Sequence, residues 1–186
     1  MYSIYGIFAV FFEKYVGLET FQTGIALVLN TAIVAIFQIP LWRLMESWRR
    51  TRILVLGACF FMLGSLGFIL SFSGPTAGLA MVLVSVTLFT FGELCHAPAS
   101  DSLIAALAPA HLRGTYMSVQ SLTWCIGLTI GPILQGRFLD AERPGTMWGL
   151  FLLLLAVAAL GLLVLERRPP ASVNRPRSRT DLPQSE

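Results

Sequence analysis

The chain has 186 residues, of which 55% are hydrophobic and 12% charged, and its net charge is +3. A soluble domain carries about 25% charged residues, so this composition argues against water as the main solvent. The basic residues stand in short clusters between apolar segments rather than on a mixed basic and aromatic surface, which excludes nucleic acid as the expected partner.

Five apolar segments are long enough to cross a bilayer core of about 30 Å. In chain order they are residues 21–42, 53–73, 77–107, 116–136 and 148–165. A shorter apolar segment, residues 1–12, precedes them, and at about 1.5 Å per residue it covers little more than half of that core. We interpret it as part of a truncated helix. The sequence therefore predicts an all-α, polytopic helical membrane protein.

The predicted organisation is one transmembrane bundle, residues 1–168, followed by a disordered cytoplasmic tail, residues 169–186, rich in Pro, Arg and Ser. The connections between the spans are short, so consecutive helices are expected to pack as antiparallel neighbours.

Lys and Arg predict the orientation of the bundle. Ten of the thirteen lie on one side, and Lys14, Arg137 and Arg143 lie on the other. By the positive-inside rule the side with ten is the cytoplasm. We therefore expect a multi-pass protein of the plasma (inner) membrane, surrounded by membrane lipid, with a cytoplasmic C-terminus.

Polar side chains inside the spans are candidates for a substrate or proton pathway, because burying them in lipid is costly. Asn30 and Gln38 are eight residues apart and share one helix face, where they either line a path or serve as hydrogen-bond partners between helices. Glu93 is a carboxylate well inside a span, and it either carries protons or cations or is paired within the structure. Gln120, which follows Val119, is assigned to the same pathway.

Charged residues at the predicted cytoplasmic ends are candidates for a gate. Ion pairs among them would hold the cytoplasmic face shut, and several such pairs would bias a balanced two-state equilibrium although each contributes only about 0–1 kcal/mol. The alternative is a solvated cluster that only sets the topology. The candidates are Glu46, Arg49, Arg50, Asp101 and Arg113.

Catalytic and metal-binding roles find little support in the sequence. Glu93, Cys95 and His96 are too close in sequence to point to one side of a helix, and the three cysteines are interpreted as small buried hydrophobes. The spans hold no paired nucleophile and base, and no GxxxxGK[ST] motif is present. We expect no enzyme activity, no metal and no cofactor, with a proton gradient as the energy source.

The fourth span carries the sharpest pattern, CIGLTIGPILQG, residues 125–136. Gly127 and Gly131 form a GxxxG pair, which lets another helix backbone approach closely. Pro132 removes a backbone donor and bends the helix. With Gly136, these residues are typical of a helix-packing hinge between moving bundles.

Two stretches resemble motifs of one transporter family. GLTIGPILQG resembles the antiporter motif GxxxGPxxGG, with Gln135 in place of one glycine, and LWRLMESWRRTRIL resembles a degenerate copy of the loop G-x-L-x-D-R-x-G-R-R, with Glu46 at the acidic position. From Met1 to about Arg168, the chain resembles the C-terminal half, helices seven to twelve, of a major facilitator superfamily transporter of the drug:proton antiporter type.

This resemblance implies a six-helix half-bundle of inverted three-helix repeats, with its first helix truncated. It also implies proton-coupled efflux of small amphipathic or drug-like molecules by alternating access. The implied partners are a small-molecule substrate and the missing N-terminal six-helix half or a second chain. A sugar or metabolite carrier of the same fold and a truncated, non-transporting membrane protein are the alternatives.

Overall fold

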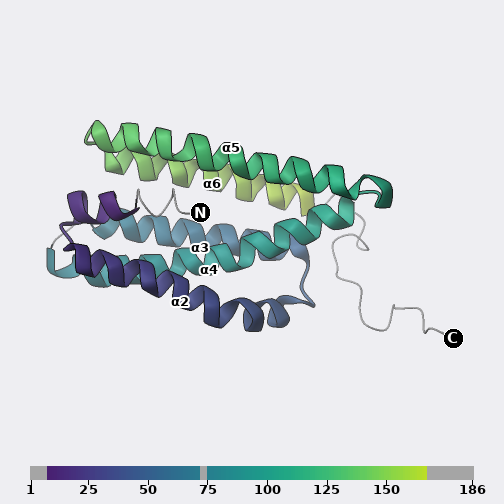
Figure 1. The fold of residues 1–186 in the computed structure, drawn as a ribbon, viewed down its shortest axis with the longest axis horizontal. Coiled ribbons are helices and arrows are strands. Elements are labelled where there is room, and N and C mark those ends of the chain that lie inside the picture. The colour runs from purple at the N-terminus through teal and green to yellow at the C-terminus, as the bar shows by residue number, and fades with distance from the viewer. Residues whose placement is uncertain (1–7, 72–74, 167–186) are drawn as a thin grey trace.

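The computed structural model describes residues 8–71 and 75–166, and this part of the chain folds into long helices (Figure 1). Five of them are long and apolar enough to cross a membrane, which confirms the prediction of an all-α membrane fold. They are α2 (Thr20–Met45), α3 (Arg50–Leu70), α4 (Pro75–Leu107), α5 (Arg113–Asp140) and α6 (Pro144–Glu166).

The helices extend beyond most of the predicted apolar segments, because the backbone hydrogen-bond ladder continues into the polar residues at their ends. α5, for example, runs from Arg113 to Asp140, whereas the apolar segment covers residues 116–136. α3 ends at Leu70, before the predicted limit of residue 73, and residues 72–74 lie outside the described part.

The two ends of the predicted bundle are only partly described. Residues 1–7 of the expected truncated helix and the expected tail, residues 169–186, lie outside the described residues. The chain is helical from Phe8 to Phe11 and continues into η1 (Phe12–Val16). This turn ends at Gly17, whose φ of 76° lies in the left-handed region that glycine adopts without steric cost.

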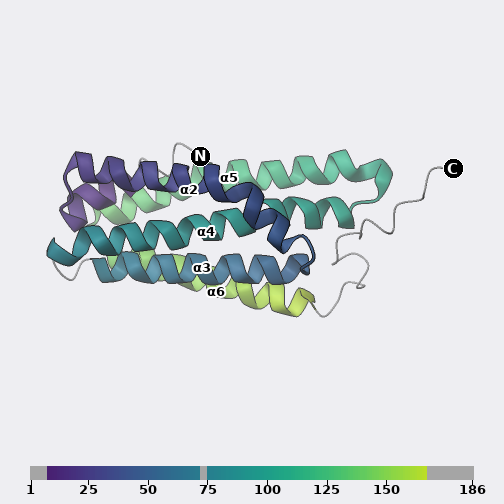
Figure 2. The same ribbon diagram turned by 90° about the horizontal axis from the view of Figure 1, so that it is seen from below.

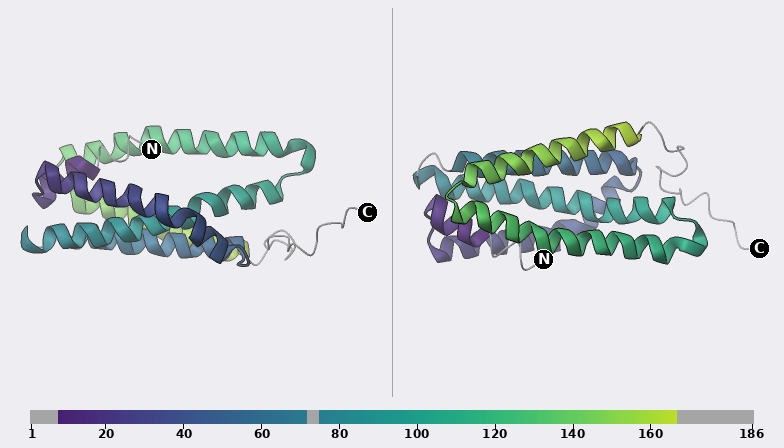
Figure 3. Two further views of the ribbon diagram at one scale, coloured as in Figure 1. Left: turned by 60° about the horizontal axis from the view of Figure 1, so that its bottom comes forward. Right: turned by 90° about the horizontal axis from the view of Figure 1, so that it is seen from above.

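The packing order of the helices differs from the expected order of consecutive neighbours. α3 packs most extensively against α4 and then against α6, while α2 packs against the other side of α4 (Figure 2). The turn between α2 and α3 fixes only their ends, so it does not decide which faces pack. α5 has few contacts with α4 and α6, and Figure 3 shows it set apart from the α3–α4 pair along most of its length.

Small residues allow α3 and α4 to approach closely. A Cβ atom added to Gly64 would lie 2.9 Å from the carbonyl oxygen of Ser85, and one added to Gly92 would lie 3.1 Å from the carbonyl oxygen of Gly57. Real Cβ atoms essentially never lie within 3.0 Å of such a neighbour, and a distance of 3.1 Å is tighter than nine in ten real Cβ contacts. Small residues at helix interfaces are the usual means of close packing between membrane helices.

An aromatic cluster closes one end of the bundle. Phe11, Phe12, Phe68 and Trp148 are buried there, and the rings of Phe68 and Trp148 lie 4.7 Å apart between centroids. The hydroxyl of Tyr15 donates a hydrogen bond to the carbonyl of Leu139 at the end of α5. The segment before α2 is thereby held to α3, α5 and α6.

The structure corrects the prediction that all three cysteines are buried. Cys95 is buried, with its sulfur 4.0 Å from that of Met45, but Cys59 and Cys125 are exposed on the outside of the described bundle. In a membrane protein the outward faces are as apolar as the core, so an apolar sequence context does not predict burial.

Candidate functional site

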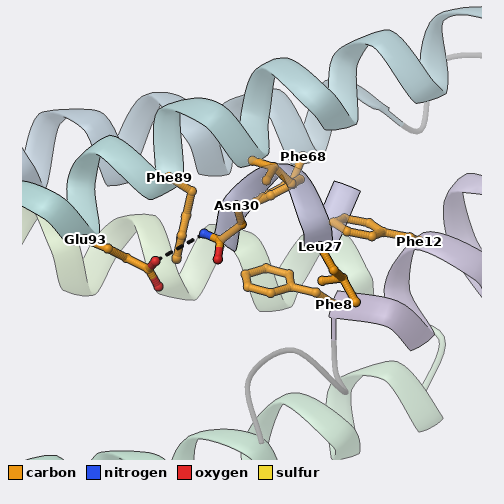
Figure 4. A pocket seen from close by; sticks show the side chains of 8 residues that line it. Phe8, Phe12, Leu27, Asn30, Phe68, Phe89 and Glu93 are labelled. Atoms are coloured by element: carbon orange, nitrogen blue, oxygen red, sulfur yellow. Dashed lines mark hydrogen bonds between the residues drawn. The ribbon is translucent and has the colours of Figure 1, made fainter. Parts of the chain in front are cut away.

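A polar cluster connects α2 and α4 inside the bundle. Asn30 is 5% exposed, and its side-chain nitrogen donates to the hydroxyl oxygen of Thr90 at 2.7 Å. The same nitrogen donates to Oε2 of Glu93 at 3.2 Å (Figure 4). The Thr90 hydroxyl in turn donates to the carbonyl of Val86 at 2.7 Å. Because an ionised carboxylate only accepts hydrogen bonds, the amide nitrogen of Asn30 is the group that must face Glu93.

Glu93 faces a small pocket whose other walls are mostly hydrocarbon. The pocket has a volume of about 20 Å³, which is enough for about one water molecule. It is lined by Phe8, Phe12, Leu27, Asn30, Phe68, Val86, Phe89 and Glu93. In such surroundings an ionised carboxylate costs free energy because it has lost its hydration. The carboxylate therefore needs either a bound proton or a nearby positive charge. A carboxylate in this setting has the chemistry to bind and release a proton.

The structure separates the four predicted pathway residues into three places. Asn30 and Glu93 meet in the pocket, as described. Gln38 is exposed on α2 and does not share the environment of Asn30, because eight residues of helix rotate the side chain by about 80°. Gln120 on α5 donates to the hydroxyl of Ser100 on α4 at 3.0 Å.

The predicted gate residues gather at one end of the bundle. Glu46 and Arg49 lie in the turn between α2 and α3, and Nε of Arg50 donates to the hydroxyl of Ser102 at 2.7 Å. This bond ties the start of α3 to α4 one residue beyond Asp101. Arg113 is exposed at the start of α5, and the gating role of the group stays a prediction.

The glycines of the predicted hinge face open space in the described chain. A Cβ atom added to Gly127, Gly131 or Gly136 would meet nothing within 4 Å. α5 continues as one helix through Pro132. Within the described residues, then, no helix makes the close approach expected at the GxxxG pair.

Two structural features have a recognisable pattern in the sequence that the sequence analysis did not use. Gly57 and Gly64 are seven residues apart, which places them on one helix face, and they form the close contact with α4. Thr90 precedes Glu93 by three residues, the spacing at which side chains on a helix are neighbours, and it completes the polar cluster.

The comparison with known families decides the identity of this helical bundle. The sequence matches the family model of the Major Facilitator Superfamily over residues 1–185. The chain belongs to the Major Facilitator Superfamily. The resemblance to this superfamily is thereby confirmed, whereas the assignment to helices seven to twelve stays a prediction.

Several superfamily relatives align with part of the chain. It is 31% identical over 77% of its length to YdeE of Escherichia coli (strain K12) and 30% identical over 75% to YhjO of Bacillus subtilis (strain 168), both named uncharacterized MFS-type transporters. It is 37% identical over 40% of its length to the multidrug resistance protein MdtH of Shigella dysenteriae, covering 20% of that protein. No solved structure matches the chain.

The matches cover only a fraction of these transporters. The chain spans 34% of the length of YdeE and 35% of the length of YhjO. A relative from Planococcus maritimus is named Na(+), Li(+), K(+)/H(+) antiporter. It is 31% identical over 59% of the chain, and the matched region makes up 25% of that relative. Membership of this superfamily points to transport rather than to enzyme catalysis.

Replacing Asn30 with alanine is expected to destabilise the bundle, because Asn30 is the donor that joins Thr90 and Glu93 across two helices. Hydrogen bonds between membrane helices contribute about 0.6 kcal/mol on average and up to about 1.7 kcal/mol. We expect a loss in this range, measured as reversible unfolding in detergent. Thr31→Ala is the matched control, since the exposed Thr31 hydroxyl bonds only to its own helix, at the carbonyl of Leu27. Equal losses in the two variants would contradict a bridging role.

Proposed function

We propose that this chain forms the C-terminal six-helix half of a secondary active transporter that exports small amphipathic or drug-like molecules in exchange for protons. The observation that carries the proposal is the carboxylate of Glu93, which lies inside a span, in a pocket of phenyl rings, and contacts Asn30 of another helix. A group of this kind binds a proton on one side of the membrane and releases it on the other when the surrounding helices move.

The position of the pocket supports this coupling. Its residues come from α2, α3, α4 and the segment before α2, so a relative shift of these helices changes the surroundings of Glu93. In alternating access one half rocks against the other around a site near the membrane midplane. The rest of the transporter, an N-terminal six-helix half or a second chain, would supply the facing wall, and the C-terminus would be cytoplasmic.

The names of two relatives support the substrate class in this proposal. MdtH is named a multidrug resistance protein, and the Planococcus relative is named a cation/proton antiporter. The second name makes exchange of an alkali cation the other candidate. Hard cations prefer several oxygen ligands, whereas the pocket walls beside Glu93 are mainly phenyl rings and aliphatic carbons. The geometry therefore favours a proton as the ion that Glu93 carries.

The test uses the full-length transporter in inside-out vesicles with an acidic lumen. We expect a fluorescent amphipathic amine such as rhodamine to accumulate in the lumen in proportion to the proton gradient, and a protonophore to abolish the accumulation. Accumulation that follows a sodium gradient instead would favour the cation exchanger. Transport of a sugar in the opposite direction, without movement of rhodamine, would contradict the proposed export.

A further inference from the structure

A second cleft lies between α4 and α5 and shares no lining residue with the Glu93 pocket. Its volume is about 400 Å³, within the range of about 300–1,000 Å³ that is usual for small-molecule sites. The residues that line it are His96 and Ser100 of α4 and Gln120, Thr123, Trp124, Gly127 and Leu128 of α5. A membrane helix facing only lipid has no need of this many polar groups.

Two aromatic side chains line the cleft, one from each helix. The indole of Trp124 is 43% exposed, and the imidazole of His96 lies at 6.1 Å from it between ring centroids, at an angle of 74°. On its other side His96 contacts the ring of Phe61 at 6.2 Å. Gly127, one turn beyond Trp124, adds no side chain, and open space adjoins it. A flat ring can therefore lie against Trp124 without displacing a side chain.

Hydrogen-bonding groups from both helices also line the cleft. The amide nitrogen of Gln120 donates to Ser100, which fixes the amide and leaves its oxygen available to accept a hydrogen bond from a ligand. The hydroxyl of Thr123 donates to the carbonyl of Val119 at 3.0 Å, so its oxygen can also accept. Among the residues that line the cleft, none carries a permanent charge.

The cleft and the Glu93 pocket share one face of α4. His96 and Ser100 follow Glu93 by three and seven residues, the spacing of neighbours on one side of a helix. A negatively charged ligand in the cleft would therefore approach the carboxylate of Glu93 and be disfavoured, whereas a cationic or neutral one would not.

We propose that this cleft binds the transported molecule, and that it selects a planar heteroaromatic ring with hydrogen-donating groups at its edge and no negative charge. The ring lies on the face of Trp124, and its edge donates to Gln120 and Thr123. A cation over an indole face gains further attraction from the ring's quadrupole. The inference rests on the proposed function in one respect only, namely that the molecule bound in the cleft is the molecule that is transported.

The test measures binding of proflavine, a planar diaminoacridine cation, to the full-length transporter in nanodiscs by fluorescence polarisation. We expect Trp124→Ala to weaken binding about tenfold and Trp124→Phe to retain part of the affinity. Gln120→Ala is expected to weaken it about fivefold. Trp48→Ala removes an exposed indole in the turn between α2 and α3, outside the cleft, and is expected to bind like the wild type. An acridine carboxylate is expected to bind at least tenfold more weakly than proflavine.

Binding is measured without a gradient, so its result is separable from that of the transport experiment. If Trp124→Ala binds proflavine as the wild type does, or if Trp48→Ala weakens binding equally, the cleft is not the site. Failure of the wild type to bind proflavine would overturn the ligand class. Binding that depends on Trp124, together with transport indifferent to protons, would support the cleft and refute proton-coupled export.

Discussion

Glu93→Gln in the full-length transporter is expected to reduce proton-driven export to background while the protein remains folded. Glutamine has nearly the shape of glutamate, and its amide oxygen still accepts the hydrogen bond that Asn30 donates to this position. It cannot, however, take up or release a proton. Export into acidic vesicles across a pH series measures the effect, and exchange of substrate without a gradient is expected to persist.

The matched control for this variant is Glu13→Gln, because Glu13 is an exposed carboxylate in η1, outside the pocket. It is expected to export like the wild type at every pH. Export by the Glu93→Gln protein that keeps the wild-type dependence on pH would remove Glu93 from the proton pathway.

Gly64→Leu is expected to have the largest effect on folding of any glycine substitution considered. A Cβ at this position would lie 2.9 Å from the carbonyl oxygen of Ser85 and 3.1 Å from the backbone nitrogen of Phe89, and these backbone atoms cannot move unless α4 moves away from α3. Overpacking costs about 1–3 kcal/mol even when it meets side chains that can shift. We expect little monodisperse protein in detergent, and a lowered melting temperature for whatever is recovered.

Gly131→Leu provides the contrast, because a Cβ there meets nothing within 4 Å. This variant is expected to insert and melt like the wild type but to lose transport, since the added bulk would separate α5 from the part of the transporter that faces it. Equal melting temperatures for Gly64→Leu and the wild type would contradict the α3–α4 packing. Normal transport by Gly131→Leu would refute the hinge role of the glycine face.

The helices themselves could be predicted because a membrane span is defined by the length of an apolar segment, a local property of the sequence. The faces on which the helices pack could not be predicted. Each span is apolar around most of its circumference, so no periodic pattern separates a lipid-facing side from a packed one. Cys59, expected inside, is exposed for this reason, and the described helices make a close contact at Gly64, where the sequence analysis predicted none.

The candidate site was predictable only in part. Glu93 and Asn30 were identified singly, because a carboxylate and an amide inside apolar spans are unusual. Their contact depends on α2 packing against α4 rather than against its neighbour in sequence, and no local signal in either helix specifies that. The separation of Gln120 from this pair has the same cause, whereas that of Gln38 follows from the rotation of about 80° between positions 30 and 38 of α2.

Proton release on substrate binding tests the assignment of Glu93 most directly. The purified full-length transporter, in weakly buffered detergent solution at neutral pH, is mixed with a saturating amount of a transported compound while the pH is recorded. The account predicts that the wild type releases about one proton for each molecule bound and that Glu93→Gln binds the compound but releases none. Equal release by both proteins, or binding by the wild type with no release, would contradict it.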